Sequence, residues 1–122
     1  MNESIVAKYA EWLASDLKLL NNHGKNFIVT PILNALNDYQ EITVSTLEDG
    51  SYHLSDEGKT LAALRFGHGV VNEEKFEGLC HQYNLERTED NQLISYCTEE
   101  KLPWTLHYMS FGLIAIFNTY FR

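Results

Sequence analysis

Apolar residues recur at two different spacings in the first half of this chain. In residues 3–21 they fall three and four positions apart, which is the period of an amphipathic helix. In residues 41–47 and 51–55 apolar and polar residues alternate, which is the period of a half-buried strand. Asp49-Gly50 lies between these two segments and suits a tight two-residue turn, because glycine adopts positive φ at no steric cost. The pattern therefore predicts an N-terminal helix and, further on, a β-hairpin.

Two shorter elements flank this hairpin. Residues 26–30 have the composition of a strand, which Pro31 should end or leave at a sheet edge, because proline has no backbone N–H to donate. Residues 60–65 return to helical spacing, and Gly67 and Gly69 follow them as helix-ending residues. We therefore expect a strand before the hairpin and a short helix after it.

The second half of the chain predicts two helices and another hairpin. Asn72 is placed to cap a helix, since its side chain can accept a hydrogen bond from the first turn. The buried stripe expected for that helix consists of Phe76, Leu79, Cys80 and Tyr83. Residues 85–88 and 92–98 have strand character and predict a hairpin. Pro103 fits the first turn of a last helix that runs to about residue 120.

The last helix is apolar on more than one face. Its large apolar residues are Trp104, Leu106, Met109, Phe111, Leu113, Ile114, Ile116, Phe117, Tyr120 and Phe121. Such a helix either lies at the centre of a core or covers a second surface in a partner. We expect a central helix, and the alternatives are a homodimer contact through it or a further C-terminal domain that covers it. Together the elements predict a single α+β domain over residues 1–122, with N-terminal, central and C-terminal helices packed on a mostly antiparallel sheet.

A longer pattern runs through the first hairpin into the next helix. It reads Asp-Gly-x-Tyr-x-Leu-Ser-Asp-x-Gly-x-Thr-Leu, preceded by Thr-Pro and Asn-Asp. The matching positions are Thr30, Pro31, Asn37, Asp38, Asp49, Gly50, Tyr52, Leu54, Ser55, Asp56, Gly58, Thr60 and Leu61. Over about residues 26–69 the chain thereby resembles the bacterial family called domain of unknown function 1828. The resemblance implies a bacterial protein encoded by a phage or another mobile element, and it implies no particular activity.

The chain is acidic along its whole length. Its 17 Asp and Glu residues against 9 Lys and Arg residues give a net charge of −8. Each half carries −4, from nine acidic and five basic residues in 1–66 and eight and four in 67–122. Nucleic-acid-binding proteins cluster Lys and Arg to replace counterions, so this charge disfavours direct binding to DNA or RNA. It suits a basic protein partner instead, including one whose own ligand is nucleic acid.

The histidines and cysteines predict neither a metal site nor a cofactor. The five histidines fall on different predicted elements, and Cys80 and Cys97 lack the spacing of a metal-binding module. We also expect no signal peptide, and the longest apolar run, residues 113–117, is too short to span a membrane. We expect a reduced, cytoplasmic protein that does not bind membranes.

Two arrangements of residues suggest catalysis. Asp49 and Glu57-Gly58-Lys59 superficially resemble the Asp…Glu-x-Lys metal site of restriction-type nucleases, but Gly58 places the Glu and Lys in a turn instead of on one strand. Cys80 could pair with a histidine across the fold, although its position on the apolar stripe favours a buried thiol. We therefore expect no catalytic residue. The alternative is a hydrolase or nuclease-related component of a bacterial defence or toxin–antitoxin system.

Acidic residues in turns and at a helix start are the candidate binding residues. Asn, Asp and Ser side chains often bond to nearby backbone amides, so a purely structural role in turns is the simpler interpretation. The functional interpretation is a surface that offers negative charge to a partner. Its candidates are Asp38, Asp56, Glu57, Glu73, Glu74 and Glu77. We interpret the chain as a non-enzymatic protein-binding domain, an inhibitor or regulator of the anti-defence or anti-CRISPR type, with an oligomerising domain of a longer protein as a further possibility.

Overall fold

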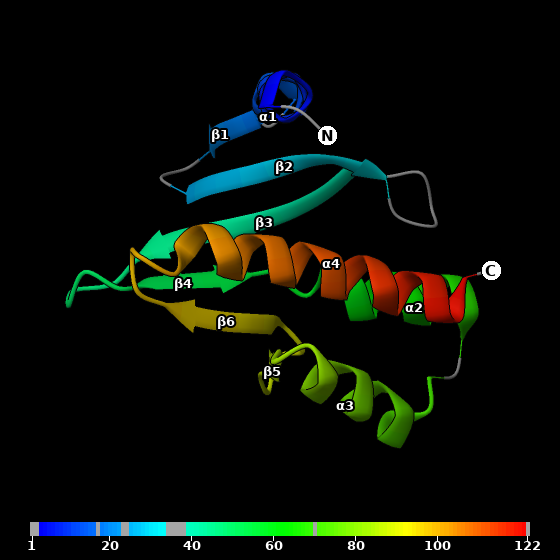
Figure 1. The fold of residues 1–122 in the computed structure, drawn as a ribbon. Coiled ribbons are helices and arrows are strands. Elements are labelled where there is room, and N and C mark those ends of the chain that lie inside the picture. The colour runs from blue at the N-terminus through cyan, green and yellow to red at the C-terminus, as the bar shows by residue number, and fades with distance from the viewer. Residues whose placement is uncertain (1–2, 17, 23–24, 34–38, 70, 122) are drawn as a thin grey trace.

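A computed structural model describes residues 3–16, 18–22, 25–33, 39–69 and 71–121 of the chain (Figure 1). The elements in chain order are α1 (Glu3–Asp16), β1 (Lys18–Asn22), β2 (Lys25–Leu33), β3 (Tyr39–Thr46), β4 (Tyr52–Ser55), α2 (Lys59–His68), α3 (Glu73–Gln82), β5 (Glu86–Arg87), β6 (Leu93–Cys97) and α4 (Leu102–Tyr120). The described strands form one sheet in the order β1-β2-β3-β4-β6-β5, and every neighbouring pair is antiparallel. The predicted α+β class is therefore confirmed.

The core lies between α4 and one face of the sheet. Figure 1 shows α4 lying in front of the sheet and running roughly along β4, with α2 next to its C-terminal part. On the sheet side, Ile42, Leu54 and Leu93 are completely buried, one from each of three neighbouring strands. On the helix side, Leu113 and Ile116 are also completely buried. The prediction that the last helix is central is confirmed, since it supplies apolar side chains to the same core cluster as the sheet.

The N-terminal segment differs from its prediction. The helix expected over residues 3–21 ends at Asp16, and residues 18–22 form strand β1. β1 pairs with β2 from Lys18↔Val29 to Asn22↔Lys25, which gives hydrogen-bond partners to the backbone groups that face β2. Pairing with a neighbouring strand overrides the local helical spacing here, because intrinsic propensity is weak compared with tertiary context.

Strand β2 also continues further than predicted, because it passes through Pro31. Two irregularities explain how a proline is tolerated there. Pairing with β1 stops at Val29, and the register with β3 shifts between Val29 and Leu33. Pro31 therefore lies where the regular ladder is interrupted and no N–H is required.

The β3–β4 hairpin forms where it was predicted, but its turn is longer than two residues. Leu47 N–H donates to Ser51 O at 2.8 Å, and Gly50 N–H donates to Leu47 O at 3.0 Å. Gly50 has a φ of 85°, whereas Asp49 is not among the residues with positive φ. A two-residue type I′ turn needs positive φ at both central positions. The loop is instead a three-residue turn with Gly50 alone in the left-handed conformation.

The predictions for the second half of the chain are confirmed. Asn72 Oδ1 accepts a hydrogen bond from Lys75 N–H at 2.9 Å and caps α3. Of the expected stripe, Phe76 and Cys80 are buried, and Leu79 and Tyr83 are half-buried. β5 and β6 form the second hairpin, and α4 carries its proline in the first turn.

Gly112 on α4 lies against Tyr83, the residue that follows α3, and a substitution can test this contact. A Cβ at Gly112 would lie 2.8 Å from Tyr83 Cβ, whereas a Cβ at Gly78 would meet nothing within 4 Å. We expect Gly112→Ala to destabilise the fold by about 1–2 kcal/mol, since overpacking outweighs the gain in helix propensity. Gly78→Ala should instead stabilise it by roughly 0.5–1 kcal/mol. Urea denaturation measures both, and equal effects would contradict the close packing.

Candidate functional site

The segment from Ser55 to Thr60 connects the end of β4 to the start of α2 around a buried carboxylate. Asp56 is only 2% exposed. Its Oδ1 accepts hydrogen bonds from the backbone N–H groups of Gly58 at 2.9 Å and Leu93 at 2.8 Å. Its Oδ2 accepts a third bond from Thr60 N–H at 3.1 Å. The prediction that Asp56 is a surface residue is wrong, because its carboxylate is buried and accepts backbone hydrogen bonds inside the fold.

The neighbours of Asp56 in the same motif have structural roles too. Ser55 Oγ accepts a bond from Glu57 N–H at 2.9 Å and donates to Gln92 Oε1 at 2.6 Å. Gly58 has a φ of 77°, which favours glycine, and it packs near Asn91 O. The Ser-Asp-x-Gly-x-Thr pattern is thus a joint that holds β4, α2 and β6 together.

The remaining candidate carboxylates differ in exposure and pairing wherever the structure describes them. Asp38 lies outside the described residues, and Glu57 is half-buried. Arg87 Nη1 forms ion pairs with both Glu73 and Glu77 on α3. The hydrogen bond from Arg87 also holds the pKa of Glu73 below its usual value.

Only part of the predicted charge on α3 is therefore available to a partner. Arg65 Nη2 lies 3.5 Å from Glu73 Oε1 and adds a second positive group on that side. Glu74 is exposed and is the α3 candidate that none of these arginine pairs involves.

The residues that suggested catalysis do not come together as a catalytic site. Asp49 lies in the turn before β4 and Glu57 in the turn after it, at opposite ends of the strand, and Lys59 Nζ pairs with Glu41 Oε2 at 2.9 Å. Cys80 is buried, and burial raises its pKa to about 11, which disfavours the reactive thiolate. Among the residues that the structure describes, no three His, Cys, Asp or Glu side chains are grouped to hold a metal ion.

The outer side of α4 carries aromatic side chains that the core does not use. Trp104 is 59% exposed and Phe111 is 62% exposed. Trp104 stacks on Tyr108 with ring centroids 4.9 Å apart, and His107 lies 6.4 Å from Phe111. We call Trp104, His107, Tyr108 and Phe111 the α4 ridge. The only sign of this surface in the sequence is that the last helix has apolar residues on more than one face.

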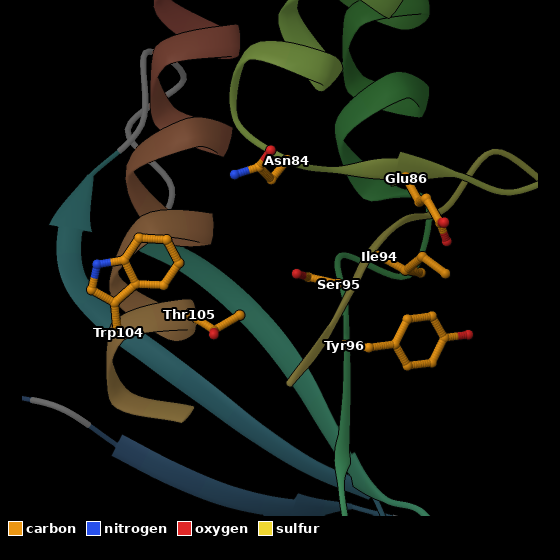
Figure 2. Close-up of a pocket in the computed structure, with 7 residues that line it drawn as sticks. All are labelled: Asn84, Glu86, Ile94, Ser95, Tyr96, Trp104 and Thr105. Carbon is orange, nitrogen blue, oxygen red and sulfur yellow. The ribbon is translucent and has the colours of Figure 1, made fainter. Parts of the chain in front are cut away.

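A hollow of about 340 Å³ lies beside the start of this ridge (Figure 2). Its lining residues are Asn84, Glu86, Ile94, Ser95, Tyr96, Trp104 and Thr105. Figure 2 shows Trp104 reaching it from α4 and Tyr96 from the other side of β6. We call this cavity the β6 hollow. None of its residues was a candidate site residue in the sequence, because they come from three separate segments.

Two acidic turns share one end of the sheet next to the β6 hollow. Tyr52 pairs with Cys97, so the turn before β4 and the turn after β6 leave the sheet at the same end, as Figure 1 also shows. Their exposed carboxylates belong to Glu48, Asp49, Glu99 and Glu100, which we call the acidic end. Hydrogen bonds from Ser51 lower the pKa of Asp49, so that carboxylate stays negative in mildly acidic solution.

These features define an α+β domain with a helical layer on one face of an antiparallel sheet and an aromatic, partly acidic surface. The chain belongs to the family described as "Domain of unknown function DUF1828", whose model matches residues 30–116. The predicted resemblance is thereby confirmed, and the match extends beyond the segment that suggested it. Neither the curated proteins nor the solved structures give a match. In the part of the chain that the structure describes, no helix is both long and apolar enough to cross a membrane.

The buried carboxylate of Asp56 gives the sharpest test of the joint. In Asp56→Asn one acceptor oxygen is replaced by an NH₂ group that faces backbone N–H groups. We expect a loss of about 1–3 kcal/mol in the free energy of unfolding for each donor left unsatisfied. Glu89→Gln removes an exposed carboxylate and should change stability by less than about 0.5 kcal/mol. Thermal or urea denaturation distinguishes the two, and a neutral Asp56→Asn would contradict the buried network.

Proposed function

We propose that this chain is a protein-binding domain that uses the α4 ridge as the centre of its binding surface. The observation that carries this proposal is the exposure of Trp104 and Phe111 on the same side of a helix whose opposite side is fully packed. Large aromatic residues exposed together are typical of interaction surfaces, where Trp and Tyr supply much of the binding energy. Tyr108 joins them through its stacking on Trp104.

The negative charge of the acidic end supports the proposal that the partner is a basic protein. Glu99 and Glu100 lie directly before α4, so their charges border the ridge at its Trp104 end. An apolar centre with a charged, solvent-exposed rim is the usual anatomy of a protein interface. Negative charge at the rim attracts a positively charged partner and accelerates the encounter.

The narrower role that we propose follows from the charge and the family together. Proteins that act on nucleic acids carry basic surfaces, and an acidic protein can occupy such a surface in place of DNA or RNA. We therefore propose an inhibitor or regulator from a phage or other mobile element, of the anti-defence or anti-CRISPR type. Capture of partners from a bacterial lysate, with and without nuclease treatment, separates direct protein binding from bridging by nucleic acid.

Truncation of the α4 ridge tests the binding surface. We expect Trp104→Ala and Phe111→Ala each to weaken binding to the captured partner by about 10- to 30-fold, which is the scale of central aromatic residues in interfaces. Phe66→Ala is the matched control, because Phe66 on α2 is 96% exposed and lies outside the ridge. Surface plasmon resonance gives the three affinities. Equal effects of all three substitutions on affinity would contradict the α4 ridge as the centre of the binding surface.

Charge reversal at the acidic end tests the role of electrostatics. Glu99→Lys combined with Glu100→Lys should slow association by about tenfold and leave dissociation almost unchanged, because rim charges act mainly through long-range steering. The melting temperature should stay nearly the same, since both side chains are exposed. Glu74→Lys on α3 is the control for total charge. Association rates that ignore both substitutions and the salt concentration would contradict a basic partner.

A further inference from the structure

Strand β6 is longer than the strand that pairs with its outer edge. β5 contains only Glu86–Arg87, and its pairing ends at Glu86↔Ile94. β6 continues to Cys97, while the chain before β5 turns away at Asn84, which has a φ of 56°. The outer edge of β6 beyond Ile94 is therefore left without a β5 residue opposite it.

The backbone direction along β6 follows from hydrogen bonds at its start. Asp56 N–H donates to Leu93 O at 3.1 Å, so the backbone groups of Leu93 point toward β4. On the other side, Thr88 N–H donates to Gln92 O at 2.9 Å, so Gln92 points outward. Successive residues of an antiparallel strand direct their backbone groups to opposite edges.

This alternation assigns Tyr96 to the outer edge. Ser95 and Cys97 then bond to β4, while the N–H and C=O of Tyr96 point away from the sheet. The ring centroids of His53 and Tyr96 lie 5.0 Å apart, which fits the closer side-chain spacing of a pair that exchanges no backbone bonds. Tyr96 therefore offers one donor and one acceptor in the direction in which a further strand would lie.

The β6 hollow lies at this same place and has two chemically different sides. Glu86 and Tyr96 lie on one side of β6, and Trp104 lies on the α4 side (Figure 2). Ile94 lies between Glu86 and Tyr96 on that side. A carboxylate and an aromatic ring on the same side of a strand favour a cationic side chain. The exposed indole of Trp104 favours an apolar one. Successive side chains of an added strand point to opposite faces, so both sides would be filled by neighbouring residues of one segment.

We propose that the β6 hollow binds an extended segment of a basic protein, in which basic and apolar residues alternate and which adds to β6 at Tyr96. The basic side chain lies against Glu86 and Tyr96, and the next side chain covers Trp104. Addition of a strand to an open sheet edge is an established mode of peptide recognition. The inference rests on the proposed protein-binding function and names the form and chemistry of its partner.

Hydrogen exchange in the free protein tests the backbone geometry first. The amide of Tyr96 should exchange roughly 100-fold faster than those of Ser95 and Cys97, because it has no ladder bond to protect it. Equal protection of all three amides in a dilute sample would overturn the open edge. Protection of Tyr96 that grows with protein concentration would show that a second copy of the chain fills the site, and would overturn the basic segment as its occupant.

A short synthetic peptide in which Val and Arg alternate is the probe for the occupant. We expect it to bind, to protect the Tyr96 amide from exchange and to shift the indole signal of Trp104. The same peptide with Glu in place of Arg should bind at least about tenfold more weakly, and Glu86→Gln should reduce this difference. Equal binding of both peptides, or no binding of either, would overturn the proposal.

Substitution of Tyr96 separates the backbone bond from the ring. Tyr96→Ala removes the ring and keeps the N–H, whereas Tyr96→Pro removes both without touching the ladder to β4. We expect Tyr96→Pro to bind the Val-Arg peptide about tenfold more weakly than Tyr96→Ala. Equal affinities of two folded variants would overturn strand addition, and amide protection in the wild type decides the question if Tyr96→Pro does not fold. If these tests exclude strand addition but Phe111→Ala still weakens binding to the captured partner, the inference is wrong and the proposed protein-binding function is still supported.

Discussion

The buried carboxylate of Asp56 is the interaction on which the arrangement of the second half of the chain depends. It accepts backbone bonds from the start of α2 and from Leu93 at the start of β6, two segments that are far apart in sequence. An ionised carboxylate in the interior is tolerated only when such bonds replace its hydration. The positive end of α2 stabilises the same charge. Because β6 leads directly into α4, the joint at Asp56 also fixes where the central helix starts.

The elements that depend on local chemistry could be predicted from the sequence, and those that depend on distant pairing could not. Gly50, Asn72 and Pro103 each mark a turn, a cap or a helix start through their own conformational preferences, and all three were placed correctly. Residues 18–22 satisfy a helical period as well as a strand, and only the pairing with β2 decides between them. The burial of Asp56 has the same origin. Its turn chemistry is local, but the N–H of Leu93 that closes over it lies 37 residues away.

The candidate surface was visible in the sequence only as an excess of apolar residues in the last helix. That excess left two interpretations open, a central helix or a second covered surface, and α4 combines a fully buried side with exposed Trp104 and Phe111. The β6 hollow left no sequence signal. The hollow exists because β5 is shorter than β6. The chain turns at Asn84, just before β5, so β5 does not extend along the rest of β6. Such a mismatch between neighbouring strands is a property of the assembled sheet.

Charged residues are spread evenly along the sequence, but the exposed negative charge is uneven over the surface of the fold. Each half of the chain carries −4, yet Asp56 is buried, and Arg87 offsets part of the negative charge of the two α3 carboxylates with which it pairs. The turns at the acidic end carry Glu48, Asp49, Glu99 and Glu100 with exposed side chains. Because Tyr52 pairs with Cys97, the two turns are held next to each other at the start of the α4 ridge. Strand pairing thus brings together exposed negative charges from two turns that are about 50 residues apart in the sequence, and it places them beside exposed aromatic rings.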